Sequence, residues 1–369
     1  MSGTTQAAPP PQRSGFGAWW HSKTPIQLSE YVIVAGGLTV AVLGSILVGD
    51  SFAHDLLTNV WWYGIAAASL IFLSAYGGMV SLAQVSLYGI SAFVLGNAVT
   101  SGQVKGLHLG YDPWVGIVLA ITITTAVGLI LGAVASRSAG IYFLMITLAF
   151  AVLTSVFFGS VTILSGFSGI SGLELTAPSV MGSTVTHPDR LYYVGLVASV
   201  LVYLLIRYVV RTPFGVTLQG VRDDPVRMAS LGYNVALHRT LAMGFAAFLA
   251  SIAGIIYAWQ FGHVDPTGTI SLSPVIDLLV IAVIGSLYSI EGAWIGALVF
   301  VVLQDYARDI PYVDRIGITQ QRFETMIGVI FLVIVLLSPA GLIGIWKWIK
   351  EQVGRLFESD ELQAEGPKS

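Results

Sequence analysis

The sequence predicts an all-α, polytopic integral membrane protein with about ten transmembrane helices in two inverted five-helix halves. Hydrophobic residues make up 55% of the chain and charged residues 10%, with a mean hydropathy of +0.80, whereas soluble domains carry about 25% charged residues. Apolar runs of about 20 residues, the length that crosses a bilayer, recur from Tyr31 to Ile345. They are continuously apolar rather than alternating, which indicates helices and excludes a β-barrel.

Polar breaks between the apolar runs predict ten spans. They lie near residues 29–49, 60–77, 83–101, 113–136, 140–160, 190–210, 239–260, 272–288, 291–306 and 323–346. Only "YGGMVS" separates the second span from the third, and only "YSIE" the eighth from the ninth, so each of these breaks is either a loop or a re-entrant bend. A division after the fifth span gives two halves of five, and an odd number of crossings per half requires opposite topologies if the halves are repeats.

The spans divide the chain into a membrane domain and two tails. Residues 1–28, rich in Pro, Gly and Ser, are expected to form a disordered cytoplasmic tail, 29–346 the membrane domain, and 347–369 a cytoplasmic C-terminal tail. With the N-terminus inside, twelve of the 17 Lys and Arg residues face the cytoplasm and five face outward. This bias follows the positive-inside rule and places both termini in the cytoplasm.

A charged cytoplasmic loop, residues 211–238, interrupts the apolar pattern between the sixth and seventh spans. Within it, "DDPVRMASLGYN" predicts a short helix, with Asp224 as N-cap, Pro225 at the first helical position and Gly232 as the left-handed residue that closes it. A helix of about seven residues is roughly 10 Å long and marginal alone in water. We therefore expect it to pack against neighbouring helix ends or a soluble partner; the alternative is an interfacial loop whose arginines only fix topology.

The loop and the helix after it, "RTPFGVTLQGVRDDPVRMASLGYNVALHRTLAMGFAAFLASIAGIIYA", resemble the LivM-type permeases of bacterial branched-chain amino-acid ABC importers. "YGGMVSLAQVSLYGISAFVLG", "GIYFLMITLAFA", "IDLLVIAVIGSLYSIEGAWIGA" and "LLSPAGLIGIW" are similar to further blocks of that family, so the resemblance covers about residues 60 to 346. The chain departs from the family pattern at Ser286, Tyr288 and Glu291, and has Asp277 where a glutamate is usual.

The resemblance implies a non-enzymatic permease subunit of an ABC importer in the bacterial plasma (inner) membrane. Its solute would be a branched-chain amino acid or a related small polar solute. It would need no cofactor of its own, because partner ATPase subunits bind the ATP. The implied partners are a second, LivH-type permease, two ATPase subunits and an extracytoplasmic solute-binding protein, with membrane lipid around them and no nucleic acid.

The resemblance also implies two sets of functional residues. The set that couples to the ATPase comprises Phe214, Gly215, Arg222, Asp223, Asp224, Met228, Ala229 and Gly232. The candidate translocation path comprises Gln84, Ser86, Tyr142, Thr147 and Asp277.

The remaining candidate chemistry is sparse. Asp277, the one carboxylate expected inside a span, either faces the path or lies solvated near the outer interface. The chain has no cysteine, its six histidines show no ligand spacing, and no Gly-Lys-Ser/Thr phosphate loop occurs, so we expect neither a metal site nor ATP hydrolysis. The rival interpretation is a self-contained, ion-coupled secondary transporter or channel, for which ionisable residues in several spans would be expected.

Overall fold

A computed structural model describes residues 51–100, 106–107, 109–178 and 188–306, together with residues 328, 329 and 341. The first predicted span, 29–49, and both tails, 1–28 and 347–369, lie outside the described residues. The same holds for the tenth span, 323–346, apart from those three single residues.

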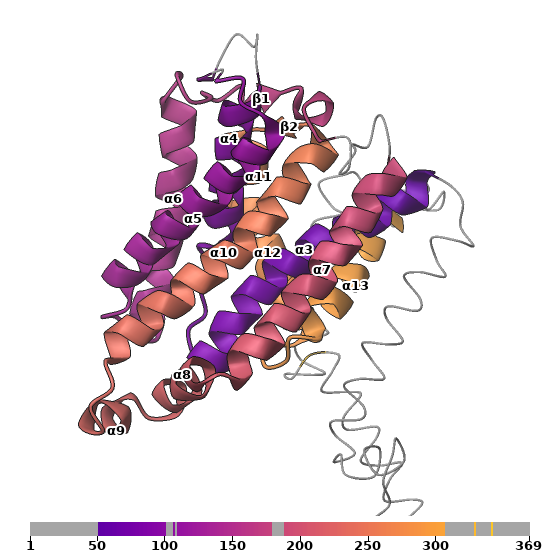
Figure 1. Cartoon of the computed structure of the whole chain (residues 1–369). Coiled ribbons are helices and arrows are strands. Elements are labelled where there is room, and N and C mark those ends of the chain that lie inside the picture. The colour runs from indigo at the N-terminus through magenta and orange to yellow at the C-terminus, as the bar shows by residue number, and fades with distance from the viewer. Residues whose placement is uncertain are drawn as a thin grey trace, which may run out of the picture. The chain divides into compact units, whose positions relative to one another are not determined.

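Helices make up nearly all of the described structure (Figure 1). They are α3 (Ser51–Gly77), α4 (Gln84–Val99), α5 (Pro113–Ala135), α6 (Ile141–Ser160), α7 (Pro188–Arg211), α8 (Pro213–Asp223), α9 (Pro225–Ser230), α10 (Val235–Phe261), α11 (Pro266–Thr269), α12 (Leu272–Gly285) and α13 (Gly292–Tyr306), with a 3-10 turn at Leu173–Leu175. Two short strands, β1 (Ile170–Ser171) and β2 (His263–Val264), pair antiparallel with Ile170 opposite Val264. The all-α prediction is confirmed, and each of the eight predicted spans that fall on described residues coincides with a helix.

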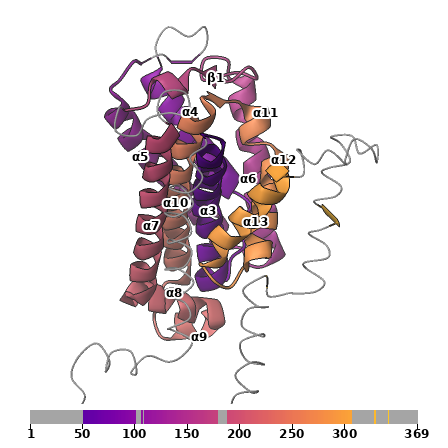
Figure 2. The same ribbon diagram turned by 90° about the vertical axis from the view of Figure 1, so that its right-hand side faces the viewer.

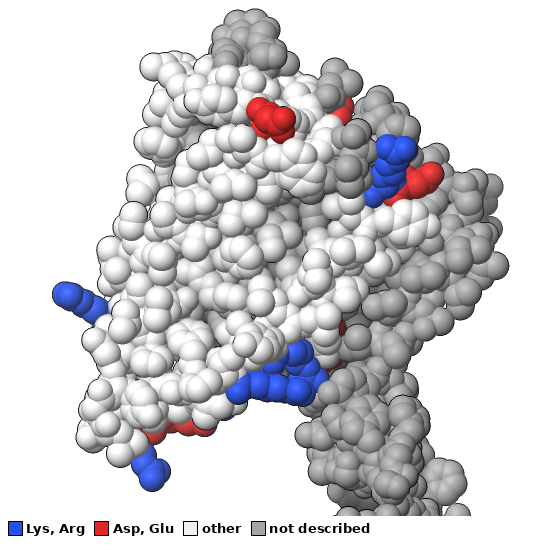
Figure 3. Space-filling model, in the orientation of Figure 1, with Lys and Arg blue, Asp and Glu red and all other residues white. Residues whose placement is uncertain are grey.

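The helices run between two distinct ends of the molecule (Figures 1 and 2). At one end, the α9 end, lie α8, α9 and the first turn of α10. At the other, the β end, lie β1, β2 and α11. On the face drawn in Figure 3, charged side chains gather toward these two ends and leave a broad uncharged band between them.

The lengths of the helices match that band. Six stretches of 20 to 27 residues are apolar enough to cross a membrane, and 20 residues rise about 30 Å, the thickness of the hydrocarbon layer. α4, with 16 residues, and α13, with 15, are apolar but shorter. The structure is therefore that of a polytopic all-α membrane protein.

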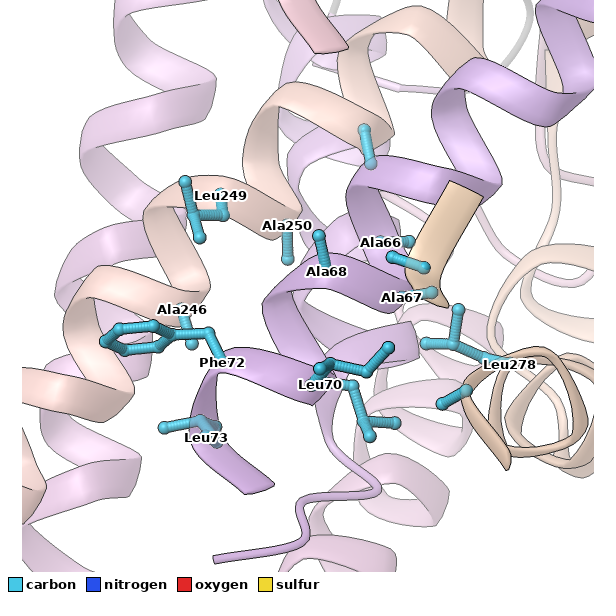
Figure 4. Packing of buried hydrophobic residues seen from close by; sticks show 14 of the residues in the cluster. Ala66, Ala67, Ala68, Leu70, Phe72, Leu73, Ala246, Leu249, Ala250 and Leu278 are labelled. Carbon is cyan, nitrogen blue, oxygen red and sulfur yellow. The ribbon is translucent and has the colours of Figure 1, made fainter. Parts of the chain in front are cut away.

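α3 and α10 form the centre of the bundle. In the most apolar stretch of each, 72% of the residues are buried, against 28% for α5, 28% for α6 and 22% for α7. Where α3 meets α10, Ala68 of α3 lies beside Ala250 of α10, and Phe72 of α3 lies beside Ala246 (Figure 4). Small side chains let two helix backbones approach closely, which supplies the packing that holds helices together in lipid.

Glycines bring the neighbouring helices still closer to α10. A Cβ atom at Gly254 of α10 would lie 2.9 Å from the carbonyl carbon of Tyr88 in α4, and one at Gly244 would lie 2.7 Å from Cγ of Leu129 in α5. Both distances are shorter than an ordinary van der Waals contact. Residue 254 therefore has to lack a side chain for α10 to pack against α4, whereas a side chain at 244 would require Leu129 of α5 to move.

Gly254→Ala is expected to destabilise the protein, because the added methyl group meets backbone atoms of α4 rather than a side chain that can move. Overpacking of this kind costs about 1–3 kcal/mol. The matched control is Gly195→Ala in α7, where the new Cβ would lie 3.3 Å from Cβ of Trp61 and a helical alanine is favoured by about 0.5–1 kcal/mol. Thermal unfolding in detergent should separate the two variants; equal midpoints would contradict the close approach.

Candidate functional site

The charged loop predicted at the cytoplasmic side contains two helices, where the sequence analysis predicted one. α8 follows α7 after the single residue Thr212, whose hydroxyl donates to the carbonyl of Val209 at 2.6 Å and accepts from the N–H of Gly215 at 3.4 Å. A Cβ at Gly215 would lie 2.5 Å from Cα of Val210. Gly215 therefore permits α8 to fold back tightly against the end of α7.

α8 is anchored on the end of α3 by its apolar face. Leu218 and Val221 have no exposed surface, and Leu218 reaches Gly77, the last residue of α3. The two residues are three apart, so they lie on one face of the helix. This spacing is present in the sequence, but the charged residues around it made residues 213–223 look like a loop, and α8 was not predicted.

Arg222 completes the attachment of α8 to α3. Its guanidinium donates a hydrogen bond to the carbonyl oxygen of Ala75 in the last turn of α3 and pairs with Asp223 at 2.7 Å. A Cβ atom at Gly78 would lie only 2.7 Å from Cγ of Arg222, and Gly78 has φ of +64°. Arg222 thus contacts the point at which the chain leaves α3 and turns back, which residue spacing could not reveal.

α9 has the two ends that the sequence predicts. The Asp224 carboxylate accepts from the N–H of Arg227 at 2.9 Å, and Pro225 occupies the first helical position. After the helix Gly232 has φ of +92°, and its N–H donates to the carbonyl of Ala229 at 3.0 Å. An α helix of six residues is thereby closed at both ends without support from a long helical body.

Met228 of α9 is held by the chain, whereas other apolar side chains of this segment are exposed. Met228 packs against α8, where a Cβ at Gly220 would lie 2.9 Å from its sulfur. Ala229 is exposed, and so are two large apolar side chains, Val226 at 75% and Leu231 at 66%. None of the residues of α9 is buried. Apolar side chains presented to solvent on a rigid segment are typical of a surface that meets a partner.

Aromatic rings tie this segment to the start of α10. The Phe214 ring of α8 stacks on His238 with 6.0 Å between centroids and 11° between planes. Tyr233 contacts the same imidazole edge-on at 6.1 Å, and the Asn234 side chain caps α10 by accepting from the N–H of Leu237 at 3.0 Å. Residues 212–238, which we call the α8–α9 segment, therefore form one connected unit.

A second polar link joins α7 to the turn between α12 and α13. Tyr203 donates to Oε1 of Glu291 at 3.1 Å, while Arg207 donates to the Tyr203 hydroxyl at 3.1 Å and lies 3.5 Å from the same carboxylate oxygen. Glu291 is one of the departures from the family pattern, and its partner lies 88 residues away. The hydrogen bond to Tyr203 and the ion pair with Arg207 explain why an acidic residue is tolerated at position 291.

The neighbouring turn is tight because α12 and α13 touch through glycines. A Cβ at Gly292 would lie 2.6 Å from the carbonyl carbon of Gly285, so the second glycine-containing break is a closely packed helical hairpin. Ser286 in this turn has φ of +140°, the one positive value at a non-glycine residue within the described chain. This conformation favours glycine, the residue that the family pattern has in this segment.

The first break is different, because the chain re-enters the protein before α4 begins. The N–H of Met79 donates to the carbonyl of Leu73 at 3.0 Å, so the chain reverses at once after α3. Gln84 then lies beside Ser69, with 3.0 Å from the Ser69 hydroxyl to Oε1 of Gln84. Since Ser69 precedes the end of α3 by eight residues, α4 starts about 12 Å inside the α9 end.

The structure brings together three of the five candidate path residues. Gln84, Ser86 and Thr147 have no exposed surface, and the Thr147 hydroxyl accepts from the N–H of Leu82 at 3.2 Å, just before α4. Tyr142 lies apart from them and is 70% exposed. It precedes Thr147 by five residues on the same helix, which at 3.6 residues per turn places the two on different faces.

Asp277 lies near the β end. It is half-buried in the second turn of α12, five residues after that helix begins at Leu272. At the standard rise it is about 7.5 Å from the helix start. In the part of the chain that the structure describes, no group of three or more His, Asp or Glu residues could hold a metal ion.

Comparison with known proteins identifies relatives over most of the chain. The model of a family described as branched-chain amino acid transport system, permease component, matches residues 52–337. The high-affinity branched-chain amino acid transport permease LivM of Salmonella typhimurium is 24% identical over 328 residues, 83% of this chain and 73% of the relative. A probable LivM permease of Methanocaldococcus jannaschii is 24% identical over 340 residues, 86% of this chain and 94% of the relative. The high-affinity branched-chain amino acid transport permease BraD of Pseudomonas aeruginosa is 24% identical over 310 residues, which cover 82% of this chain and 94% of the relative. No solved structure gives a significant match.

Arg222→Ala is expected to loosen the chain reversal after α3, because the carbonyl of Ala75 loses its charged donor. A hydrogen bond to a charged group contributes about 1.5–3 kcal/mol when desolvated; Arg222 is 38% exposed, so we expect the lower end. Hydrogen–deuterium exchange at the amides of residues 79–83 should accelerate about tenfold. The control is Arg227→Ala, an exposed arginine of α9, which should leave those amides unchanged. Equal effects of the two variants would contradict the role of Arg222.

Proposed function

The chain belongs to the branched-chain amino acid transport permease family, and from this premise we propose that its solute is a branched-chain amino acid or a related small polar solute, carried inward. As a member of that family it is a permease subunit of an ABC importer, and such a subunit works with other components of the transporter. The substrate named for the relatives supports the choice of solute. The permease would perform no chemical reaction itself.

The partners that we propose supply the energy for transport, complete the solute path and deliver the solute. Two ATPase subunits would bind and hydrolyse ATP, and one of them would dock on the α8–α9 segment. A second, LivH-type permease would complete the path, and an extracytoplasmic binding protein would deliver solute at the β end. In an alternating-access cycle, ATP binding would favour one conformation and hydrolysis would restore the other.

The single observation that carries this proposal is the construction of the α8–α9 segment. It is fixed to α3 through Leu218 and Arg222, and it presents the exposed side chains of Val226 and Leu231. A displacement imposed on α9 by a partner would therefore reach α3 rather than be absorbed in a flexible loop. An interfacial loop that served only to fix topology would need neither the two caps nor the attachment.

Charge supports a cytoplasmic position for the α9 end. Among the described residues, six arginines lie at or near that end: Arg137, Arg207, Arg211, Arg222, Arg227 and Arg239. At the β end lies Arg190, together with acidic residues that include Asp112, Glu174 and Asp265. Basic residues concentrate on the cytoplasmic side of membrane proteins, which would place the ATPase partners at α9 and the plasma membrane around the apolar band.

The double substitution Val226→Asp with Leu231→Asp is expected to weaken association with the ATPase subunits by about 30-fold or more, since the loss of even one central interface residue costs about 2 kcal/mol. Uptake should fall with it. The measurement is co-purification of the ATPase with the permease, alongside ATP-driven leucine uptake in proteoliposomes.

The matched control is Ile163→Asp, an equally exposed apolar residue (68%) that follows α6 near the β end. It should leave ATPase association unchanged. Normal association and uptake in the α9 variant would overturn the docking assignment. Uptake by the permease alone, driven by a sodium or pH gradient, would instead support the rival secondary transporter.

A further inference from the structure

α4 begins inside the protein, and its first turn has no capping side chain. The residue before it, Ala83, occupies the N-cap position and can offer no acceptor, and no side-chain cap bond is formed there. The first amides of a helix have no partner within the helix, and the aligned peptide dipoles give this end a partial positive charge. At the depth of Ser69 that positive end lies among fully buried residues.

Two polar side chains in the same turn are also without partners. Nε2 of Gln84 and Oγ of Ser86 are both buried and make no hydrogen bond, and both residues have no exposed surface. A buried donor left unpaired destabilises the fold, because it has lost its hydrogen bonds to water without gaining others. Packing does not require this, because an apolar side chain of similar size would fill the space without that cost.

Other buried serines on these two helices are satisfied. Ser69 of α3 donates to Oε1 of Gln84 at 3.0 Å, and Ser91 of α4 donates to the carbonyl of Ser251 at 2.8 Å. Gln84 and Ser86 lie two residues apart, so the first turn of α4 holds two unpaired buried donors side by side. Their chemistry points to a ligand that accepts hydrogen bonds.

We propose that the first turn of α4 receives the carboxylate group of the transported solute, with Nε2 of Gln84 and Oγ of Ser86 as donors. This rests on the proposed function, because it takes the solute to be an amino acid. A carboxylate has the charge that the helix N-terminus favours and accepts several hydrogen bonds at once. Broken helices near the middle of the membrane bind anionic substrate groups in this manner in several transporter folds.

Access to this turn is controlled by two attachments already described. On one side Thr147 of α6 accepts a hydrogen bond from the N–H of Leu82. In this part of α6 only one face of the helix is buried, formed by Phe143, Thr147 and Ala151. On the other side Arg222 of α8 contacts the last turn of α3, from which the chain leads directly to α4. Movement of the α8–α9 segment would therefore expose or cover the site as the partners bind and hydrolyse ATP.

The absence of cysteine from the chain allows a direct test. In the full transporter with its partners, Ser86→Cys is labelled with an anionic methanethiosulfonate reagent through the ATPase cycle, in the presence and absence of solute. We expect labelling in one nucleotide state, and protection by leucine of about tenfold or more. Isoamylamine, which has the side chain of leucine but no carboxylate, should not protect. The control is Ser91→Cys on the same helix, which should not show this pattern.

Each outcome bears on the proposal. Equal protection by leucine, leucinamide and isoamylamine, or no labelling in any nucleotide state, would overturn the carboxylate site. Protection by leucine and acetate, with no ATP-driven leucine uptake by the unsubstituted transporter, would leave the site standing and overturn the proposed solute instead.

A second variant avoids dependence on the cysteine. Gln84→Glu places a negative charge at the positive end of α4, and should raise the KM for leucine uptake about tenfold or more relative to Gln84→Asn, with ATPase association unchanged. An unaltered KM in Gln84→Glu would contradict the assignment.

Discussion

The reversal of the chain after α3 is the constraint on which the rest of the structure depends. Inside a membrane, backbone groups that leave a helix must find partners within the protein, because no water is present to bind them. Here Leu73 pairs with Met79, Thr147 with Leu82 and Arg222 with Ala75. Three separate elements, α3, α6 and α8, are therefore needed for α4 to begin where it does.

The helices of the bundle differ in how much of their surface is buried. α3 and α10 pack through alanines and glycines and form the buried centre, while α5, α6 and α7 present apolar side chains outward. Outward apolar surface is at no disadvantage in lipid, and it leaves these helices free to pair with a second membrane subunit. Hydrogen bonds of Arg222 and Thr147 link α8 and α6 to the chain at and just after the end of α3, close to the buried start of α4.

The sequence predicted the parts of this arrangement that depend on local chemistry. Apolar length gave the spans, and the Asp224, Pro225 and Gly232 pattern gave both ends of α9, because caps and span lengths depend only on neighbouring residues. It did not predict α8, because Leu218 and Val221 lie in a stretch that the surrounding arginines and glycines made look like a loop.

Long-range pairs could not be predicted from one sequence. Arg222 meets Ala75 across 147 residues and Tyr203 meets Glu291 across 88, and no spacing rule connects such positions. The different faces of Tyr142 and Thr147, by contrast, follow from helix geometry and could have been deduced from their five-residue separation.

The central claim is that α8 and the end of α3 move as one body. Pulsed electron resonance on the full transporter would test it most directly, with spin labels on cysteines introduced at Thr217 of α8 and Ser74 of α3, and a second pair at Ser74 and Ser155 of α6. We expect the distance between α8 and α3 to stay constant between the nucleotide-free and ATP-bound states, while the distance between α3 and α6 changes. A shift of α8 relative to α3, with α3 and α6 unmoved, would contradict the account.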